Sequence, residues 1–191
     1  MEVETENGEY TENHVLQQWR VAGVFTINPA EKKVLPFEDT LPLETPITEV
    51  SCRYNKNRVW LQTGMAIDLA RDASDRDFLR IAPTPAMTAF LEAMKICGFS
   101  LYQADVEKGY FRARDFHSRS GCYQELEFRP AGFGQWEINE IEVSFVPDEG
   151  LTHIMLEVDR KLRRGKLTTL TLYHDRLNPH TLAKQIQGML R

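Results

Sequence analysis

Glu140-Ile-Glu-Val-Ser-Phe145 is the stretch of sequence that decides the fold class. Its apolar residues, Ile141, Val143 and Phe145, alternate with polar residues, and this period of two is typical of a β-strand with one buried and one wet face. The same alternation occurs in three other stretches, at residues 125–129, 154–159 and 168–172. Strands of this kind, joined by short turns, indicate antiparallel sheets that bury one side. We therefore predict a β-sandwich in the second half of the chain.

Two helices are expected beside these strands. Thr84 can cap the first helix, Pro85 suits its first position, and Gly98 can end it. Between these residues, apolar side chains recur at helical spacing and form one stripe, which we interpret as a packing face. The dipeptide Asn178-Pro179 begins the second helix. The prediction is one short helix that opens the second half and one at the C-terminus.

The first half of the chain also favours strands. Residues 15–22 alternate with a period near two, and shorter strands are expected at residues 59–61, 65–67 and 78–81. The intervening residues 68–77 carry four aspartates and two arginines. Because the aspartates do not follow the ligand spacing of a calcium loop, we interpret this segment as a solvated link between strands.

Charge divides the chain near two prolines. The 191 residues include 23 basic and 28 acidic side chains, and the net charge of −5 argues against a general nucleic-acid binder. The excess of acidic side chains lies in residues 1–84, because acidic and basic side chains balance in residues 85–191. The boundary coincides with Ala82-Pro83-Thr84-Pro85. We predict an N-terminal sandwich over 1–84, which is short for a complete one, and a C-terminal sandwich with flanking helices over 85–191.

The N-terminus and the cysteines favour a cytoplasmic protein. Residues 1–6 are acidic where a signal peptide has a basic start, and uncharged stretches such as residues 21–30 are far shorter than the roughly 18 apolar residues of a membrane span. Cys52, Cys97 and Cys122 show no Cys-x-x-Cys spacing, so neither a disulfide framework nor a zinc site is expected. We expect reduced thiols and no membrane span, and these features do not favour contact with membranes.

Catalytic templates find little support in the sequence. The five histidines lack the same-face spacing of a helical metal pair, and there is no Gly-x-Ser-x-Gly or Ser-x-x-Lys motif. One enzyme alternative stays open, with Cys122 as a nucleophile and His117 as its base, because Arg114 and Arg119 could lower the thiol pKa. The opposing interpretation is a buried strand thiol without chemistry. Outside this alternative we expect no catalytic residue, cofactor or metal.

One basic cluster stands out in this acidic chain. It lies at a predicted hairpin tip, and its members are Arg160, Lys161, Arg163, Arg164 and Lys166. Such a local field could attract an acidic protein surface, phospholipid headgroups or nucleic acid, although charge runs are usually solvated turns. Aromatic residues do not interleave with the cluster, so the stacking platform of a single-strand binder is missing. We take the five residues as candidates for binding a partner, with binding to an anionic surface as the alternative.

Several segments resemble a known family. Residues 21–37 and 41–48 resemble the strand, turn and proline pattern of arrestin-like sandwich domains. More specifically, Val59-Trp-Leu-Gln-Thr-Gly-Met-Ala-Ile-Asp68 is similar to the bacterial sporulation-control family of the stage-zero M type. Four further segments continue this similarity, at residues 78–85, 124–130, 140–145 and 156–160. The resemblance covers nearly the whole chain.

The resemblance implies a mainly β protein built from two tandem antiparallel sandwiches of arrestin-like type, without cofactor or catalytic residues. It also implies a regulatory or scaffolding role in development or cell-cycle control, exerted through protein partners whose identity the sequence does not give. Members of that family usually run longer at the N-terminus. A first half of this size would leave a sheet edge uncovered, which predicts either a homodimer through that edge or a chain shorter than the working protein.

Overall fold

The computed structural model describes the chain except for residues 6–9, 69–70, 133–136, 162 and 191. It is mainly β with two α-helices, which confirms these two parts of the predicted fold class. The elements in chain order are β1 (Glu2–Glu4), β2 (Thr11–Asn13), β3 (Tyr54–Asn55), β4 (Trp60–Met65), β5 (Ala73–Phe78), α1 (Pro85–Ile96), β6 (Phe99–Lys108), β7 (Cys122–Pro130), β8 (Ile138–Asp148), β9 (Leu151–Arg160), β10 (Arg163–Tyr173), a short 3₁₀ helix (His174–Arg176) and α2 (Pro179–Met189).

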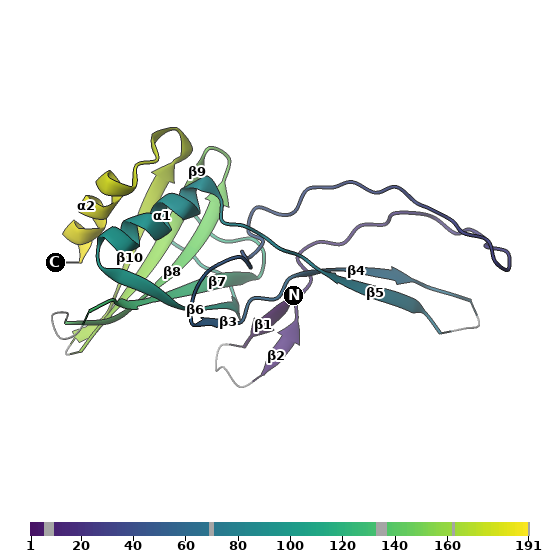
Figure 1. Ribbon diagram of the computed structural model, residues 1–191, viewed down its shortest axis with the longest axis horizontal. Helices are drawn as coiled ribbons and strands as arrows, with labels where there is room; N and C mark the ends of the chain where they lie inside the picture. Colours follow the sequence, from purple (N-terminus) through teal and green to yellow (C-terminus); the bar gives the residue numbers. More distant parts are fainter. Residues whose placement is uncertain (6–9, 69–70, 133–136, 162, 191) are drawn as a thin grey trace.

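One sheet forms the body of the molecule (Figure 1). Strands β6 to β10 are antiparallel neighbours in the order β10-β9-β8-β7-β6. Beyond β6 the sheet continues with β1 and β2, and β1 runs parallel to β6 with Glu4 opposite Glu107. Strand β3 also pairs with β6 in parallel, with Tyr54 opposite Gln103. Strands from the first half of the sequence therefore extend the sheet of the second half.

Both helices lie over one face of this sheet (Figure 1). The Phe90 side chain of α1 is fully buried and packs edge to face against Phe128 and Phe145, with ring centroids 6.3 and 5.5 Å apart. The predicted helix ends are also present. The Thr84 hydroxyl accepts a hydrogen bond from a backbone N–H of the first turn, and Gly98 follows the helix with a φ of 85°. The apolar stripe of α1 is thus the packing face that the sequence predicts.

One strand prediction for the first half is wrong at residues 15–22. This segment runs away from the body as a loop (Figure 1) and belongs to no strand. Its alternating pattern is satisfied by extended backbone alone, whereas a strand also needs a neighbouring backbone to pair with. Of the strand predicted at residues 78–81, only Phe78 lies in a strand.

The charged segment at residues 68–77 is also not the simple link that was expected. Its second part forms β5, which pairs antiparallel with β4 so that Phe78 lies opposite Trp60. The two rings lie 5.9 Å apart, and the Arg76 guanidinium lies 4.4 Å from the centre of the Trp60 ring. These cross-strand contacts outweigh the low strand propensity of aspartate.

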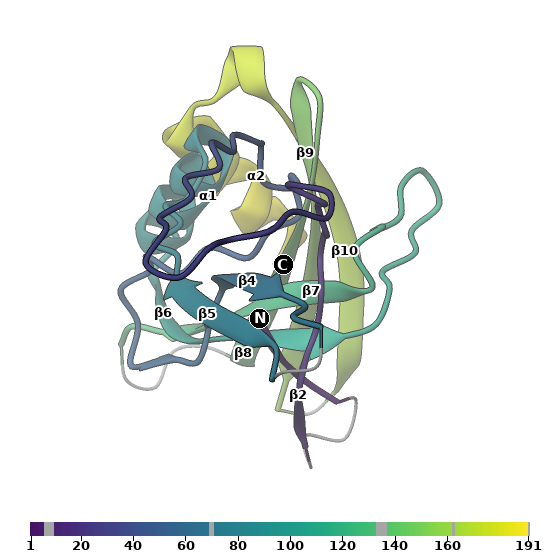
Figure 2. The same ribbon diagram turned by 90° about the vertical axis from the view of Figure 1, so that its right-hand side faces the viewer.

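Two segments project from the body on the same side (Figures 1 and 2). We call residues 15–43 the arm, and we call the β4–β5 hairpin the ribbon. The arm runs outward, turns at Asn28 to Glu31 and runs back. In this turn the Glu31 carboxylate accepts hydrogen bonds from the backbone and side-chain N–H groups of Asn28, and Ala30 has a φ of 64°. The ribbon is a separate sheet of two strands in the described structure.

The division into domains 1–84 and 85–191 stays a prediction. In the described structure, β1, β2 and β3 belong to the sheet that β6 to β10 form. A small apolar cluster joins the two halves, because Val3 and Val59 pack with Val106 and Cys122. The larger core lies between the sheet and the two helices and is formed mainly by the second half.

Candidate functional site

The basic cluster of residues 160–166 lies at the turn between β9 and β10, as the sequence predicts. Lys161 and Lys166 are exposed, whereas the side chains of Arg163 and Arg164 lie outside the described part of the structure. Arg160 is half-buried, and its Nη2 donates a hydrogen bond of 2.6 Å to the Leu190 carbonyl oxygen. A cation is favourable at the C-terminal end of a helix, so Arg160 holds the end of α2. Partner binding by the cluster stays a prediction.

An acidic group that the sequence analysis missed lies on the other face of the sheet from the helices. It crosses four strands, and we call it the acidic ladder. Its members are Asp105 and Glu107 on β6, Glu125 and Glu127 on β7, Glu140 and Glu142 on β8, and Glu157 on β9. Register places Asp105 opposite Glu125 and places Glu142 opposite both Glu127 and Glu157. The alternation shows that these residues face away from the core, but only the strand register brings them together.

Protonation relieves repulsion within the acidic ladder. Burial, followed by the nearby Glu142 carboxylate, raises the pKa of Glu125 to about 8. Burial also raises the pKa of Glu142, although the hydrogen bond with Glu125 acts in the opposite direction. The pair therefore titrates as a unit and holds one proton at neutral pH.

Cations compensate the two ends of the acidic ladder. At one end, Arg129 forms ion pairs with Glu127 and, at 3.6 Å, with Glu140, and its guanidinium lies 3.6 Å from the centre of the Tyr102 ring. At the other end, the Lys56 ammonium lies 3.7 Å from Asp105. Within the part of the chain that the structure describes, the carboxylates between these ends have no ion pair with a basic side chain.

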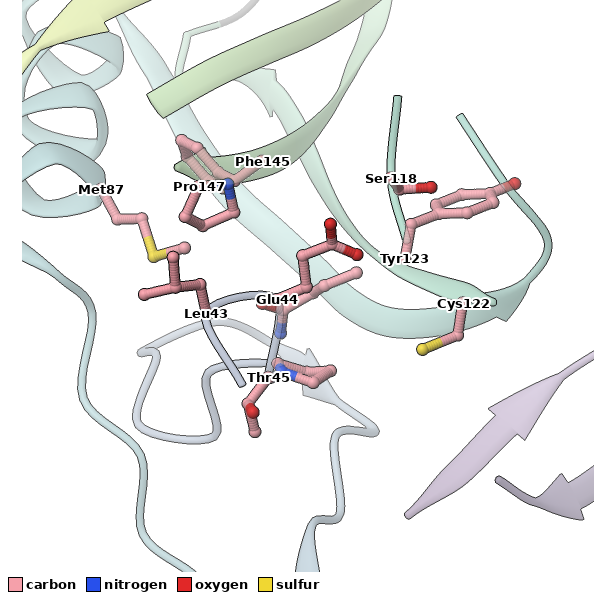
Figure 3. A pocket seen from close by; sticks show the side chains of 11 residues that line it. Leu43, Glu44, Thr45, Met87, Ser118, Cys122, Tyr123, Phe145 and Pro147 are labelled. Atoms are coloured by element: carbon pink, nitrogen blue, oxygen red, sulfur yellow. The ribbon is translucent and has the colours of Figure 1, made fainter. Parts of the chain in front are cut away.

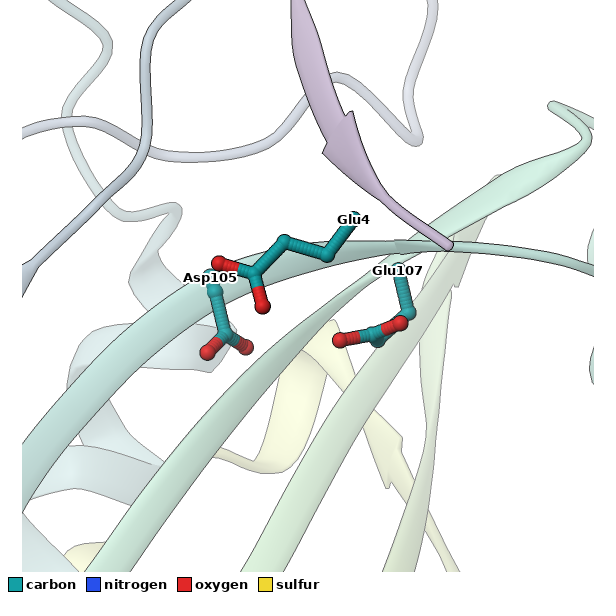
Figure 4. A group of neighbouring side chains, drawn as sticks. All are labelled: Glu4, Asp105 and Glu107. Atoms are coloured by element: carbon teal, nitrogen blue, oxygen red, sulfur yellow. The ribbon is translucent and has the colours of Figure 1, made fainter. Parts of the chain in front are cut away.

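Three carboxylates converge where β1 meets β6 (Figure 4). Ligand oxygens of Glu4, Asp105 and Glu107 lie within 4.8 Å of one another, a spacing that suits a cation. The Lys56 ammonium lies beside two of these carboxylates, 2.8 Å from Glu4 and 3.7 Å from Asp105. The Gln103 amide also donates a 2.6 Å hydrogen bond to Asp105. Lys56 and Gln103 compensate part of this charge, and we interpret the group as a link between β1, β3 and β6.

The geometry opposes the alternative of a cysteine enzyme. Cys122 is only 1% exposed, and burial raises the pKa of its thiol to about 11. At neutral pH the thiol is therefore protonated, whereas a nucleophile needs the thiolate. His117 lies in the loop between β6 and β7, where its backbone pairs with that of Arg112. The buried-thiol interpretation of Cys122 fits this environment.

A small pocket lies where the returning run of the arm meets the body (Figure 3). Its cavity volume is ≈ 10 Å³, which is at most enough for one water molecule. The Glu44 carboxylate at its rim accepts hydrogen bonds from the backbone N–H groups of Arg119 and Ser120, at 3.0 and 2.9 Å. Nearby, the Gln124 amide forms two hydrogen bonds with the Ile47 backbone. The pocket is an anchoring point for the arm and has no room for a small-molecule substrate.

The outgoing run of the arm is anchored at the same loop. The His14 imidazole Nε2 donates a 2.7 Å hydrogen bond to the Ser120 carbonyl oxygen, and the His14 backbone N–H bonds to the Met1 carbonyl oxygen at 2.8 Å. Ser120 therefore contacts both roots of the arm through its backbone, since its N–H group binds Glu44. The arm projects from fixed roots.

Comparison with known proteins places these features in context. A family model described as SpoOM protein matches residues 1–162. The sporulation-control protein spo0M of Bacillus subtilis is 34% identical over 168 residues, which are 87% of this chain and 62% of that protein. The crystal structure of Bacillus subtilis Spo0M superposes with a TM-score of 0.82 at 30% identity, over 99% of this chain and 79% of that chain. A bilayer span would require a longer and more apolar helix than any that the described residues form.

Proposed function

Because the chain belongs to the SpoOM family of sporulation-control proteins, we propose that it is a non-enzymatic regulatory protein that acts by binding other proteins. The chain spans 62% of the length of its curated Bacillus subtilis relative. Family membership therefore supports a regulatory role, and we infer the mode of action from the surfaces of this chain.

The observation that carries the proposal is the extended backbone left open on the arm and the ribbon. An unpaired strand edge offers a row of N–H and C=O groups to an extended partner, and alternate side chains add specificity. The ribbon has only two strands, and the arm has no strand partner within the described residues. Surfaces of this kind favour protein binding over small-molecule chemistry.

Two further observations support a role without catalysis. The enzyme site that the sequence left open uses Cys122 as its nucleophile. The Cys122 thiol is buried, and burial raises its pKa to about 11. The pocket at Glu44 is too small for a substrate. The exposed Lys161 and Lys166 at the β9–β10 turn then contribute long-range attraction to an acidic partner, which raises the rate of encounter.

Affinity purification of the tagged full chain from cells of its source, after chemical crosslinking, tests the proposal. The wild-type chain and the variant Ile96→Asp, which changes an exposed apolar residue of α1, should recover the same protein partner. The variant Val24→Asp/Val34→Asp in the arm should lose it. Recovery of nothing above background by the wild-type chain, or equal recovery by the arm variant, contradicts the proposal.

A further inference from the structure

The sheet of the body ends in β10, whose outer edge has no neighbouring strand in the described structure. β10 is 11 residues long, whereas the opposite border of the sheet ends in β2, which has only 3 residues. Proteins normally shorten, charge or bulge an edge strand, because its free N–H and C=O groups pair with other chains. The sheet thus has a short strand at one border and a long open strand at the other.

Only the start of β10 carries features that protect an edge. The register with β9 shifts between Arg163 and Lys166, and Lys166 is an exposed charge. The rest of the strand is Leu167-Thr-Thr-Leu-Thr-Leu-Tyr173, which contains no charge, proline or glycine. Such a segment has the composition of a strand that pairs readily with another strand.

The register shows which backbone groups of β10 point outward. The His174 N–H donates a 2.9 Å hydrogen bond to the Gly150 carbonyl oxygen, directly beyond the last pair of the β9–β10 ladder. Hydrogen-bonded pairs alternate along an antiparallel ladder, so the residues that bond to β9 are those at 166, 168, 170 and 172. The outward N–H and C=O groups therefore belong to Leu167, Thr169, Thr171 and Tyr173.

These outward groups have no backbone partner within the described residues. β10 pairs with β9 alone, and none of the backbone hydrogen bonds of turns and loops involves residues 167–173. Leu167 and Tyr173, at the two ends of the row, are 54% and 55% exposed. Because β9 already holds β10 in place, a strand that docks here orders little of this chain, which lowers the entropic cost of binding.

The two ends of β10 differ in charge. Its start adjoins the basic cluster, of which Lys161 and Lys166 are exposed. Its end adjoins the β8–β9 turn, where Asp148 and Glu149 are exposed. A partner strand with acidic residues only at the end beside the basic cluster is complementary to both ends.

From this geometry we infer that the outer edge of β10 binds an extended segment of a partner protein as an added antiparallel strand. The segment has an uncharged middle and an acidic C-terminal flank. Antiparallel pairing matches the order of β6 to β10, and it places the C-terminal end of the added strand beside the basic cluster. Backbone hydrogen bonds supply affinity, and the flank supplies selectivity. The inference rests on the proposed function, since it names a second protein-binding surface and the segment that it takes.

A synthetic peptide serves as the probe. Its sequence is Thr-Val-Ser-Val-Thr-Val-Ser followed by Asp-Glu-Asp-Glu, with both ends blocked, and it is titrated into the full chain at low salt. We expect a dissociation constant in the micromolar range. A peptide with four lysines as its flank should bind at least about 10-fold more weakly. A peptide with N-methyl groups along its middle should not bind, because it has no N–H groups to donate.

Hydrogen exchange measured by NMR locates the added strand. In the free chain, the amides of Thr168 and Leu170 should exchange slowly, and the outward amides of Leu167, Thr169, Thr171 and Tyr173 should exchange fast. The peptide should slow the outward set. Binding without this protection overturns the inference. Protection in the free chain that grows with its concentration would mean that β10 pairs with a second copy, which also overturns it.

Variants of the edge test the same contacts from the side of the chain. Thr169→Pro removes one outward N–H but no bond to β9, and edge strands tolerate proline at such a position. It should weaken peptide binding by at least about 10-fold, whereas Thr169→Ala should bind as the wild type does. Equal binding by both variants contradicts the inference.

Charge variants test the flank without altering the edge. Lys161→Glu/Lys166→Glu should weaken peptide binding by about 10-fold or more. Lys32→Glu/Lys184→Glu makes the same change of charge at exposed positions of the arm and α2, and it should leave the dissociation constant unchanged. Equal weakening in both double variants would show that net charge alone governs binding and would overturn the role of the basic cluster.

The arm variant separates this inference from the proposed function. Val24→Asp/Val34→Asp should bind the peptide as the wild type does, because the arm is no part of the β10 edge. If the wild-type chain does not bind the peptide but still recovers a protein from cells through its arm, the inference fails and the proposed function stands.

Discussion

The carboxyl groups of Glu125 on β7 and Glu142 on β8 share a hydrogen bond on the face of the sheet that the helices leave open. Asp105 and Glu107 lie close enough to raise the pKa of Glu125 further. Between the two ends that Arg129 and Lys56 compensate, a retained proton lowers the repulsion among these carboxylates, and this has measurable consequences.

Stability should fall as the pH rises from about 5 to about 8. The pKa of Glu125 is raised from its ordinary value of 4.5 to about 8, so the folded chain keeps a proton that the unfolded chain loses within this window. Below the window both states are protonated, and above it both are ionised. Glu125→Gln should flatten the pH dependence of the free energy of unfolding, measured in urea at several pH values. Glu149→Gln in the exposed turn between β8 and β9 is the control, and an identical slope in both variants would contradict the assignment.

Arg160→Ala should lower the free energy of unfolding by about 1–2 kcal/mol, because it removes a charge-assisted hydrogen bond to the end of α2. Lys161→Ala removes the adjacent exposed charge and should change it by less than about 0.5 kcal/mol. Urea denaturation measures both values. Equal effects would show that the contact between Arg160 and Leu190 contributes nothing of its own.

Phe90→Ala should lower the free energy of unfolding by about 3–5 kcal/mol. The ring is fully buried and packs against Phe128 and Phe145, so its removal leaves a cavity. Ile96→Ala changes a half-exposed residue at the end of the same helix and should lower the free energy of unfolding far less. Thermal or urea unfolding of the two variants distinguishes the packing face of α1 from its outer face.

Glu44→Ala should release one root of the arm. Hydrogen exchange at the backbone amides of Arg119 and Ser120 should become faster, since both lose their acceptor. Glu38→Ala, which removes an exposed carboxylate of the arm itself, should leave both amides protected. Unchanged exchange in Glu44→Ala would mean that the body holds the arm by other contacts.

Thiol labelling at neutral pH should leave Cys122 unmodified in the folded chain and should modify all three cysteines after unfolding. Burial protects the Cys122 thiol sterically and keeps it protonated. Peptide mapping identifies the labelled residues. Fast labelling of Cys122 in the folded chain would revive the enzyme alternative.

The second half of the fold could be predicted because its signals are local. Alternation marks β7, β8 and β9, and Thr84 and Gly98 mark the ends of α1. The first half could not be predicted in this way. Residues 15–22 have the alternating pattern of a strand, but a strand also needs a neighbouring backbone, which the pattern does not reveal. Strand β5 shows the reverse case, because it lacks the pattern and still pairs with β4.

The candidate surfaces differ in the same respect. The basic cluster is contiguous in sequence, and so its position at a turn was predictable. The acidic ladder draws its members from four strands, and only the register between these strands places Glu125 near Glu142. A sequence shows which residues face away from a core but not which of them become neighbours.

The contact between α1 and α2 has a consequence for folding during synthesis, because α1 is made well before α2. Leu182 and Ile186 of α2 are buried in the same core as Phe90 of α1, and the Cys97 thiol reaches the Ala183 carbonyl oxygen at 3.4 Å. The core therefore stays open while a ribosome is still adding residues of α2. During translation, the apolar face of α1 and the sheet beneath it remain accessible to chaperones until the last turn of α2 has left the exit tunnel.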